Sequence, residues 1–177
     1  TLILYDQAET PLYYLELELL DLAPDLEIVP IVASVTDQDA VTQAFETHKP
    51  QKVYHAAAYK HVPLMEQNPR SAALTNILGT YLVGLAAARA GAQAFVLVST
   101  DKAVRPSNVM GATKQAAERA VLHLQEQYPD TSFGAVRFGN VLGSSGSVIP
   151  LFERQLEREE PLTLTDEDTT RYFMTIP

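Results

Sequence analysis

The sequence contains no cysteine and no basic patch, and we find in it no apolar run long enough to span a membrane. Without cysteine, disulfides and thiolate metal sites are excluded. Asp and Glu number 22 against 13 Lys and Arg, and the net charge of −9 argues against a nucleic-acid partner and against attraction to anionic lipid. The four histidines have no metal-ligand spacing, and no signal peptide is visible. We therefore expect no metal site, no nucleic acid and no direct membrane contact.

A glycine-rich turn of the kind that binds pyrophosphate in dinucleotide-binding folds is missing as well. The chain enters directly on an apolar strand, residues 2–5, and stops in an apolar segment, residues 171–177. These features predict a fragment of a longer protein, truncated at both ends. Its 177 residues, 46% of them hydrophobic, still suffice for one domain with a hydrophobic core.

Short apolar segments alternate with amphipathic ones along the chain. This alternation predicts an α/β fold, a Rossmann-like doubly wound parallel sheet with helices on both faces. In the first helix we expect Leu12, Leu15, Leu19 and Leu22 to share one buried side, and Pro30 favours a sheet edge for the second strand. We expect strands at residues 2–5, 27–32, 52–55, 95–98, 133–138 and 162–164, and helices at residues 11–22, 37–48, 69–91, 107–128 and 148–158.

The chemically richest stretch begins where the strand at residues 95–98 ends. Four reactive side chains follow it at once: Ser99, Thr100, Asp101 and Lys102. In open α/β sheets, ligands bind outside the carboxyl ends of the strands. The sequence therefore predicts hydroxyls, a carboxylate and an ammonium at a ligand site. Ordinary turn chemistry is the alternative, because Ser, Thr and Asp are common in turns.

The helix that follows carries two more candidate residues. Ser107 or Asn108 can cap its start, and Met110 and Lys114, four residues apart, share one of its faces. This spacing predicts that Lys114 reaches the ligand site at the strand end. The alternative is a solvated helix lysine.

Two acids and an alanine run are candidates for a cofactor site. Asp6 ends the first strand, where an acid holds the ribose hydroxyls in dinucleotide-binding folds, although an Asp there can also cap a helix. Asp37 begins the second helix. Ala56, Ala57 and Ala58 follow the third strand, and such small residues let a flat ligand approach the backbone. Tight helix–sheet packing explains the alanines equally well.

The remaining candidates are weaker when taken one by one. Asn76 lies inside a helix, where an amide is mildly unfavourable, so we expect either a tertiary hydrogen bond or exposure. His61 is expected to be a hydrogen-bonded structural residue rather than a catalyst. Residues 139–147, rich in glycine and serine, can face an anion with their amides or form a plain flexible loop. Arg171 is a planar donor suited to phosphate.

Six short motifs follow one another in a specific order. They are residues 56–63 (AAAYKHVP) with Glu66, 76–80 (NILGT), 99–106 (STDKAVRP), 111–114 (GATK), 137–144 (RFGNVLGS) and 170–176 (TRYFMTI). Together they resemble the extended short-chain dehydrogenase/reductases. More narrowly, they resemble the polysaccharide-biosynthesis nucleoside-diphosphate-sugar 4,6-dehydratases that act on UDP-N-acetylglucosamine. The resemblance covers nearly the whole chain.

The resemblance implies a redox-neutral dehydration with tightly held NAD, rather than NADP, as cofactor. Hydride leaves sugar C4, a base removes the C5 proton while an acid protonates the departing C6 hydroxyl, and hydride returns to C6. By resemblance, Thr100 bonds the C4 oxygen, Asp101 is the acid, which can also serve the C4 proton, and Lys102 is the C5 base. Lys114 holds the nicotinamide ribose, and Met110 packs against sugar or nicotinamide.

The resemblance also assigns binding residues and a setting. One NAD(P)-binding domain is expected over residues 1–177, with residues 140–177 contributing to the sugar-nucleotide side. The full-length protein is expected to be a homo-oligomer, and this part a cytoplasmic domain of a bacterial protein anchored in the inner membrane. The cofactor-binding residues are expected to be Asp6, Asp37, Ala57, Ala58, Tyr59, Asn76 and Lys114. The residues that bind the UDP-sugar are expected to be Lys60, His61, Asn140 and Arg171.

Two departures from the family pattern keep other functions open. Met110 stands where the superfamily usually has a tyrosine, and a thioether cannot exchange a proton at neutral pH, so that role moves to another group. The glycine-rich loop is absent, which predicts little activity for this fragment alone. One alternative is a sugar-nucleotide 4-epimerase, which has no C6 leaving group for Asp101 and Lys102 to serve. The other is a non-catalytic nucleotide-sugar-binding domain.

For a dehydratase of the methionine type, the resemblance implies retention at C5.

Overall fold

The computed structural model describes residues 1–143, 148–163, 170 and 172–175. By its contacts the chain divides into two units, Thr1–Val136 and Arg137–Pro177. The first unit holds the alternating strands and helices that the sequence predicts. Among its described residues, the second unit holds one helix and a pair of two-residue strands.

The strands that follow the predicted alternation form two sheets. β1 (Leu2–Asp6) pairs in parallel with β2 (Ile28–Val32). β3 (Lys52–His55) pairs in parallel with β4 (Ala94–Thr100), and β4 is the central strand of a sheet that β5 (Ser132–Phe138) completes. The predicted α/β, Rossmann-like class is confirmed, although the described strands form separate sheets rather than one.

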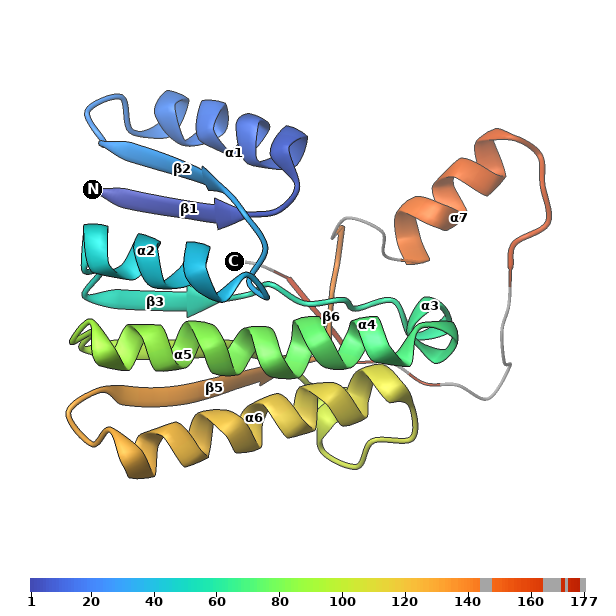
Figure 1. Ribbon diagram of the computed structural model, residues 1–177. Coiled ribbons are helices and arrows are strands. Elements are labelled where there is room, and N and C mark those ends of the chain that lie inside the picture. Colours follow the sequence, from blue (N-terminus) through green and yellow to red (C-terminus); the bar gives the residue numbers. More distant parts are fainter. Residues whose placement is uncertain (144–147, 164–169, 171, 176–177) are drawn as a thin grey trace. The chain divides into compact units, whose positions relative to one another are not determined.

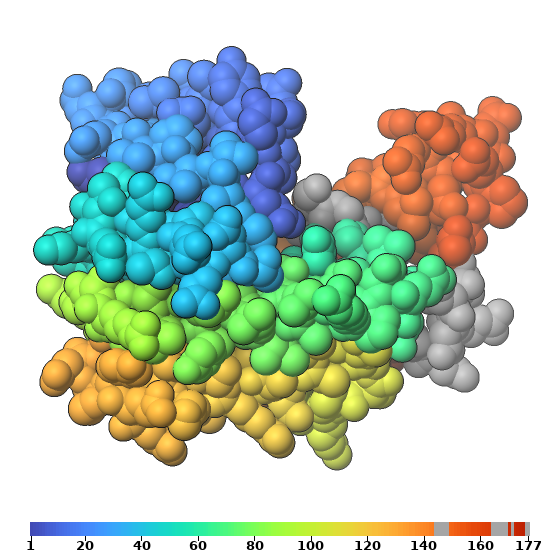
Figure 2. All heavy atoms as spheres, in the orientation of Figure 1, coloured from blue at the N-terminus to red at the C-terminus, as the bar shows by residue number. Residues whose placement is uncertain are grey.

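Helices connect the strands and cover them. α1 (Glu9–Leu22) packs on β1 and β2. α2 (Gln38–His48), α5 (Thr80–Arg89) and α6 (Val109–Gln127) lie side by side, and α5 contacts both of its neighbours (Figures 1 and 2). α6 also packs on β4, so one helix carries its residues directly to the end of the central strand.

The main hydrophobic core lies where β4 meets α6. Side chains of a strand alternate between its two faces, and in β4 the alternate residues Phe95, Leu97 and Ser99 are buried. Phe95 and Leu97 pack with Ala117 and Val121 of α6. Ser99 continues this buried face, so the core ends in a hydroxyl at the carboxyl end of β4.

The first helix buries less than the sequence predicts. Leu12 is buried, but Leu15 and Leu22 are 42% and 75% exposed. The expectation of one buried leucine side is therefore wrong for these two residues. Leu12 and Leu19 lie seven residues apart, about two turns of a helix, and Leu19 is partly buried; Leu15 and Leu22 lie on a neighbouring flank.

The helix expected at residues 69–91 is continuous but not uniform. It consists of α4 (Pro69–Ala73), a π-helical segment (Leu74–Gly79) and α5. Gly91, just beyond its end, has a φ of +77°, a left-handed conformation that glycine adopts without strain. Gly91, the residue at which the sequence predicts the end of this helix, therefore serves as its C-terminal cap.

By length and composition, Pro69–Arg89 could cross a membrane, with a mean hydropathy of 1.4. The expectation of no apolar run of that length is therefore wrong. The helix nevertheless packs on α6 and buries Asn76 and Thr80, which both hydrogen-bond inside the first unit. The core helix of a globular domain meets the same criterion, so the run itself is weak evidence for a membrane span.

The second unit pairs two segments that are distant in sequence. β6 (Asn140–Val141) runs parallel to β7 (Phe173–Met174), and α7 (Val148–Glu157) lies between them in the chain. The strand expected at residues 162–164 is not found at residues 162 and 163, and residue 164 lies outside the described residues. The amide of Gln155 instead holds Thr163 through two hydrogen bonds.

Candidate functional site

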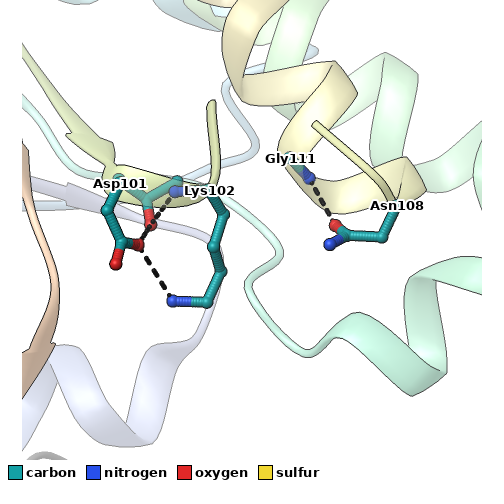
Figure 3. Close-up of polar contacts among 5 residues, drawn as sticks. Asp101, Lys102, Asn108 and Gly111 are labelled. Atoms are coloured by element: carbon teal, nitrogen blue, oxygen red, sulfur yellow. Dashed lines mark hydrogen bonds and ion pairs between the residues drawn. The ribbon is translucent and has the colours of Figure 1, made fainter. Parts of the chain in front are cut away.

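Three of the predicted catalytic side chains meet at the end of β4. Residues Asp101–Ala103 form a 3-10 turn, η2, directly after the strand. The Lys102 ammonium donates to Asp101 Oδ1 at 3.0 Å, and the Thr100 hydroxyl donates to the same oxygen at 3.0 Å. Figure 3 shows the Asp101 carboxylate and the Lys102 ammonium turned toward each other. Hydroxyl, carboxylate and ammonium therefore form one cluster at a strand end.

The cluster stabilises the ionised form of Asp101. Burial alone would raise the pKa of this carboxyl. Hydrogen bonds from Lys102 and Thr100, together with the charge of Lys102, outweigh burial and hold the pKa of Asp101 below its usual value. Asp101 is therefore an anion at neutral pH in this state. To act as an acid it must first receive a proton.

The start of α6 lies directly against this turn. Asn108 caps the helix by accepting a hydrogen bond from the Gly111 amide at 2.8 Å (Figure 3), as the sequence predicts. Glu66 accepts a second hydrogen bond from the Val109 amide at 2.7 Å. A Cβ atom on Gly111 would lie 2.5 Å from the Lys102 carbonyl oxygen. The absence of a side chain at Gly111 therefore lets η2 approach the helix.

Met110 and Lys114 are both buried on the inner face of α6. Met110 packs in an apolar cluster with Met65 and Ala72. The Lys114 ammonium donates to the Val98 carbonyl oxygen at 2.7 Å. Burial lowers the pKa of Lys114 to about 8, and the negative charge of Glu118 opposes part of that fall. The solvated alternative for Lys114 is therefore wrong: its ammonium is tied to the central strand.

A second group of predicted residues lines a small cavity. The cavity has a volume of about 110 Å³, and its polar wall includes Asp6 at the end of β1. The carboxylate of Asp6 also accepts a hydrogen bond from the Ala8 amide at 2.7 Å. Ala57, Ala58 and Tyr59 line the same cavity. Four of the predicted cofactor-binding residues thus surround one hollow.

Asn76 fixes the loop that carries Tyr59. Its side chain is fully buried and accepts from the Tyr59 amide at 2.8 Å. It donates to the Tyr59 carbonyl at 3.1 Å and to the Thr113 hydroxyl at 2.9 Å. Of the two readings that the sequence left open, the tertiary hydrogen bond is therefore correct. Asn76 acts on the cavity through Tyr59 and joins it to α6.

His55 continues this polar network through Thr80. Its Nε2 lies 3.0 Å from the Thr80 hydroxyl, which itself donates to the Asn76 carbonyl at 2.7 Å. Because that hydroxyl proton is committed to Asn76, His55 must donate from Nε2. Burial, and then the charge of Lys114, lower the pKa of His55 to about 4. His55 is thus a neutral, buried donor that the sequence did not single out.

Four other predicted site residues, Asp37, Lys60, His61 and Asn140, are not among those that line the cavity. Asp37 caps α2 by accepting from the Ala40 amide at 3.0 Å. Lys60 and His61 lie in the exposed loop before the short helix α3 (Val62–Gln67). Asn140 lies in β6 of the second unit. Arg171 lies outside the described residues, as do residues 144–147 of the predicted anion loop. Their binding roles stay predictions.

Glu118 is a second buried residue near the site that sequence reasoning missed. It lies one turn after Lys114 on α6, is buried, and accepts a hydrogen bond from the Ser99 hydroxyl. Its burial could have been recognised from the sequence, because Glu118 lies on the same helical face as residues 110, 114, 117 and 121. A carboxylate within that apolar pattern indicates a buried partner.

The whole chain, residues 1–177, matches the family described as "Polysaccharide biosynthesis protein". It is 51% identical over 177 residues to the capsular polysaccharide biosynthesis protein CapD of Staphylococcus aureus, covering 99% of this chain and 30% of CapD. Among solved structures it is similar to Pen from Bacillus thuringiensis, with a TM-score of 0.89 and 38% identity, over 98% of this chain and 54% of that one. The chain thus spans only part of the length of these relatives.

Relatives named for a reaction include dehydratases and epimerases of sugar nucleotides. The UDP-N-acetylglucosamine 4,6-dehydratase (inverting) of Campylobacter jejuni is 40% identical over 127 residues, 70% of this chain and 38% of that protein. A UDP-glucose 4-epimerase of Rickettsia canadensis is 38% identical over 147 residues, 82% of this chain and 42% of that protein. The family resemblance that the motifs indicate is confirmed: the chain belongs to the polysaccharide biosynthesis protein family, on a Rossmann-like α/β fold.

Proposed function

We propose that this chain is part of a longer, NAD-dependent 4,6-dehydratase of a UDP-N-acetylhexosamine, with UDP-N-acetylglucosamine as the first substrate to test. The observation that carries the proposal is the Asp101–Lys102 ion pair beside Thr100 at the end of the central strand. Elimination of water across C5 and C6 needs an acid and a base on one small ring. An epimerase needs neither group at C6.

The ion pair is one proton transfer away from the acid and base that this reaction requires. Its Nζ and Oδ1 atoms lie 3.0 Å apart. Moving the shared proton from Lys102 to Asp101 gives a neutral amine, which is a base, and a carboxylic acid. Water favours the charged pair. A bound sugar would remove water from both groups, and desolvation disfavours charge on each of them, so substrate binding would favour the neutral pair.

The elimination step balances its protons within the pair. Lys102 takes the proton from sugar C5 and becomes an ammonium. Asp101 gives its proton to the C6 hydroxyl, which leaves as water, and becomes a carboxylate. The pair thus returns to the ionised state of this structure. The C4 hydroxyl proton, released when hydride leaves C4, passes to water; when hydride returns to C6, the Lys102 ammonium returns a proton to C5 and the pair regains one from water. Met110, buried with Met65 and Ala72, needs to carry no proton in this scheme.

The residues around the cavity fit the adenosine end of NAD. The carboxylate of Asp6 suits the two neighbouring hydroxyls of a ribose, and Ala57 and Ala58 leave room for a flat ring beside the backbone. When bound, NAD would accept hydride from C4, which acidifies the C5 proton, and return it to C6. On this proposal Lys114 orients the nicotinamide ribose and Thr100 the C4 oxygen.

The test is incubation of the longer parent protein with UDP-N-acetylglucosamine and NAD, followed by mass spectrometry of the sugar nucleotide. A product lighter by one water is expected. The variants Asp101→Asn and Lys102→Gln should each slow its formation by roughly 10²- to 10⁴-fold, the usual share of acid–base catalysis, with NAD binding retained. Asp130→Asn, which removes the same charge from an exposed turn, should leave the rate unchanged.

A 4-epimerase is the second candidate, favoured by the Rickettsia relative. It would give a C4 epimer of unchanged mass, and Asp101→Asn would then have little effect. Binding of both ligands without any product would instead indicate a domain that has kept the fold and lost the chemistry. Either result would overturn the dehydratase.

A further inference from the structure

We propose that Glu118 is the internal counter-ion of Lys114 and a positioning residue for the lysine. The two residues lie one turn apart on α6, and both are buried, at 6% and 5% exposure. Each is bound to the end of β4, Glu118 by the Ser99 hydroxyl and Lys114 by the Val98 carbonyl. Consecutive residues of one strand thus hold the carboxylate and the ammonium. The link to cofactor binding rests on the proposed function, whereas the charge pairing does not.

The burial of both groups explains why they occur together. An isolated ammonium or carboxylate in this setting would lose its hydration without compensation. Breaking such a pair by removing one partner leaves an uncompensated buried charge. Because the buried Ser99 hydroxyl and the Val98 carbonyl both belong to β4, Lys114 keeps one orientation at the strand end.

The other titratable groups near Lys114 do not replace Glu118. His55, at the end of β3, is neutral because its pKa is about 4, and the charge of Lys114 contributes to that low value. From η2, Asp101 is engaged by Lys102 and Thr100. Among the described residues, Glu118 is the carboxylate whose charge opposes the loss of the Lys114 proton.

The direct test is a titration of the 177-residue chain by NMR with carbon-13 at the lysine ε position. The Lys114 signal is identified by its absence in Lys114→Arg, and its midpoint in the unmutated chain is expected near pH 8. In Glu118→Gln, which keeps the shape and removes the charge, the midpoint should fall by about 1 pH unit, the usual effect of one close opposite charge. Glu118→Asp, which keeps the charge, should restore most of the fall.

A matched control lies on the same helix. Glu126 is exposed, so Glu126→Gln removes the same charge and should leave the Lys114 midpoint in place. A Lys114 midpoint that is equal in the unmutated chain and in Glu118→Gln would overturn the proposal. So would equal midpoints in the Gln and Asp variants at residue 118.

A second measurement uses the unmutated chain and so does not depend on the folding of a Glu118 variant. In the unmutated chain, the carboxyl-carbon signal of Glu118 should shift with the same midpoint as the Lys114 signal. At that pH Lys114 loses its positive charge, and the neighbouring carboxylate of Glu118 senses the loss. A Glu118 signal that stays constant through the Lys114 titration would overturn the pairing. Neither readout requires NAD or turnover, so failure of the proposed function would leave this test intact.

Discussion

At the residue scale, the buried histidine gives the most direct pH dependence. The pKa of His55 is lowered from 6.5 to about 4 in the folded protein, so as the pH falls the unfolded chain takes up a proton before the folded one does. Stability is therefore lost as the pH falls from 6.5 to about 4, and this loss amounts to about 3 kcal/mol. His55→Gln removes the titration and should remove that part of the pH dependence.

Urea unfolding at a series of pH values measures this difference. His123→Gln is the control, because His123 is exposed on α6 and should leave the pH dependence of the unmutated chain in place. Equal pH dependence in His55→Gln and the unmutated chain would show that His55 is protonated without cost, contrary to its burial.

Single residues also show what the sequence alone could establish. The candidates Thr100, Asp101 and Lys102 could be found because they follow a strand of unmistakable composition. The tertiary role of Asn76 could only be posed as one of two possibilities. Whether a polar residue inside a helix is buried depends on its partners, here Tyr59 and Thr113, and these are distant in sequence.

At the scale of elements, the contact between η2 and α6 depends on Gly111. A Cβ atom there would lie 2.5 Å from the Lys102 carbonyl oxygen, which is backbone and cannot move alone. Gly111→Ala should therefore lower the free energy of unfolding by about 1–3 kcal/mol, as overpacking does, and shift the turn that carries Asp101. Gly134→Ala, which meets nothing within 4 Å, is the matched control. Equal unfolding midpoints in urea would contradict the contact.

The π-helical segment Leu74–Gly79 is tied to the cavity loop through Asn76. Asn76→Ala leaves the amide and carbonyl of Tyr59 without this partner. The free energy of unfolding should fall by about 1–3 kcal/mol, and the Tyr59 amide should exchange its hydrogen faster. The control is Asn68→Ala, which removes an exposed side-chain amide. It should change neither the free energy of unfolding nor the exchange rate of the Tyr59 amide. Unchanged exchange at Tyr59 would show that the loop is held by other contacts.

Elements with strong local signals could be predicted, and those set by distant partners could not. The Asn108 cap and the edge position of Pro30 follow from side-chain chemistry within a few residues, and both are found. The pairing of Asn140–Val141 with Phe173–Met174 joins two-residue strands, too short for any periodicity. The exposure of Leu15 and Leu22 depends on which flank of α1 meets a sheet, which leucine spacing alone does not decide.

At the scale of the whole molecule, the chain should bind NAD only weakly by itself. The residues that surround the cavity supply a ribose site and room for a ring. They do not include a glycine-rich turn at a helix start, which is the anion site that holds pyrophosphate in this class of fold. Isothermal calorimetry of the 177-residue chain should give an affinity weaker than micromolar. Micromolar or tighter binding would contradict this expectation.

The dehydratase proposal itself belongs to the longer protein, because the chain spans 30% of CapD and 38% of the Campylobacter dehydratase. Its central claim is that Asp101 and Lys102 move protons at C6 and C5 of one sugar. The most direct measurement is proton NMR of UDP-N-acetylglucosamine incubated with the parent protein and NAD in deuterated water. The predicted result is a 4-keto-6-deoxy product with deuterium at C5. Unchanged substrate with both ligands bound, or a C4 epimer without deuterium at C5, would contradict the claim.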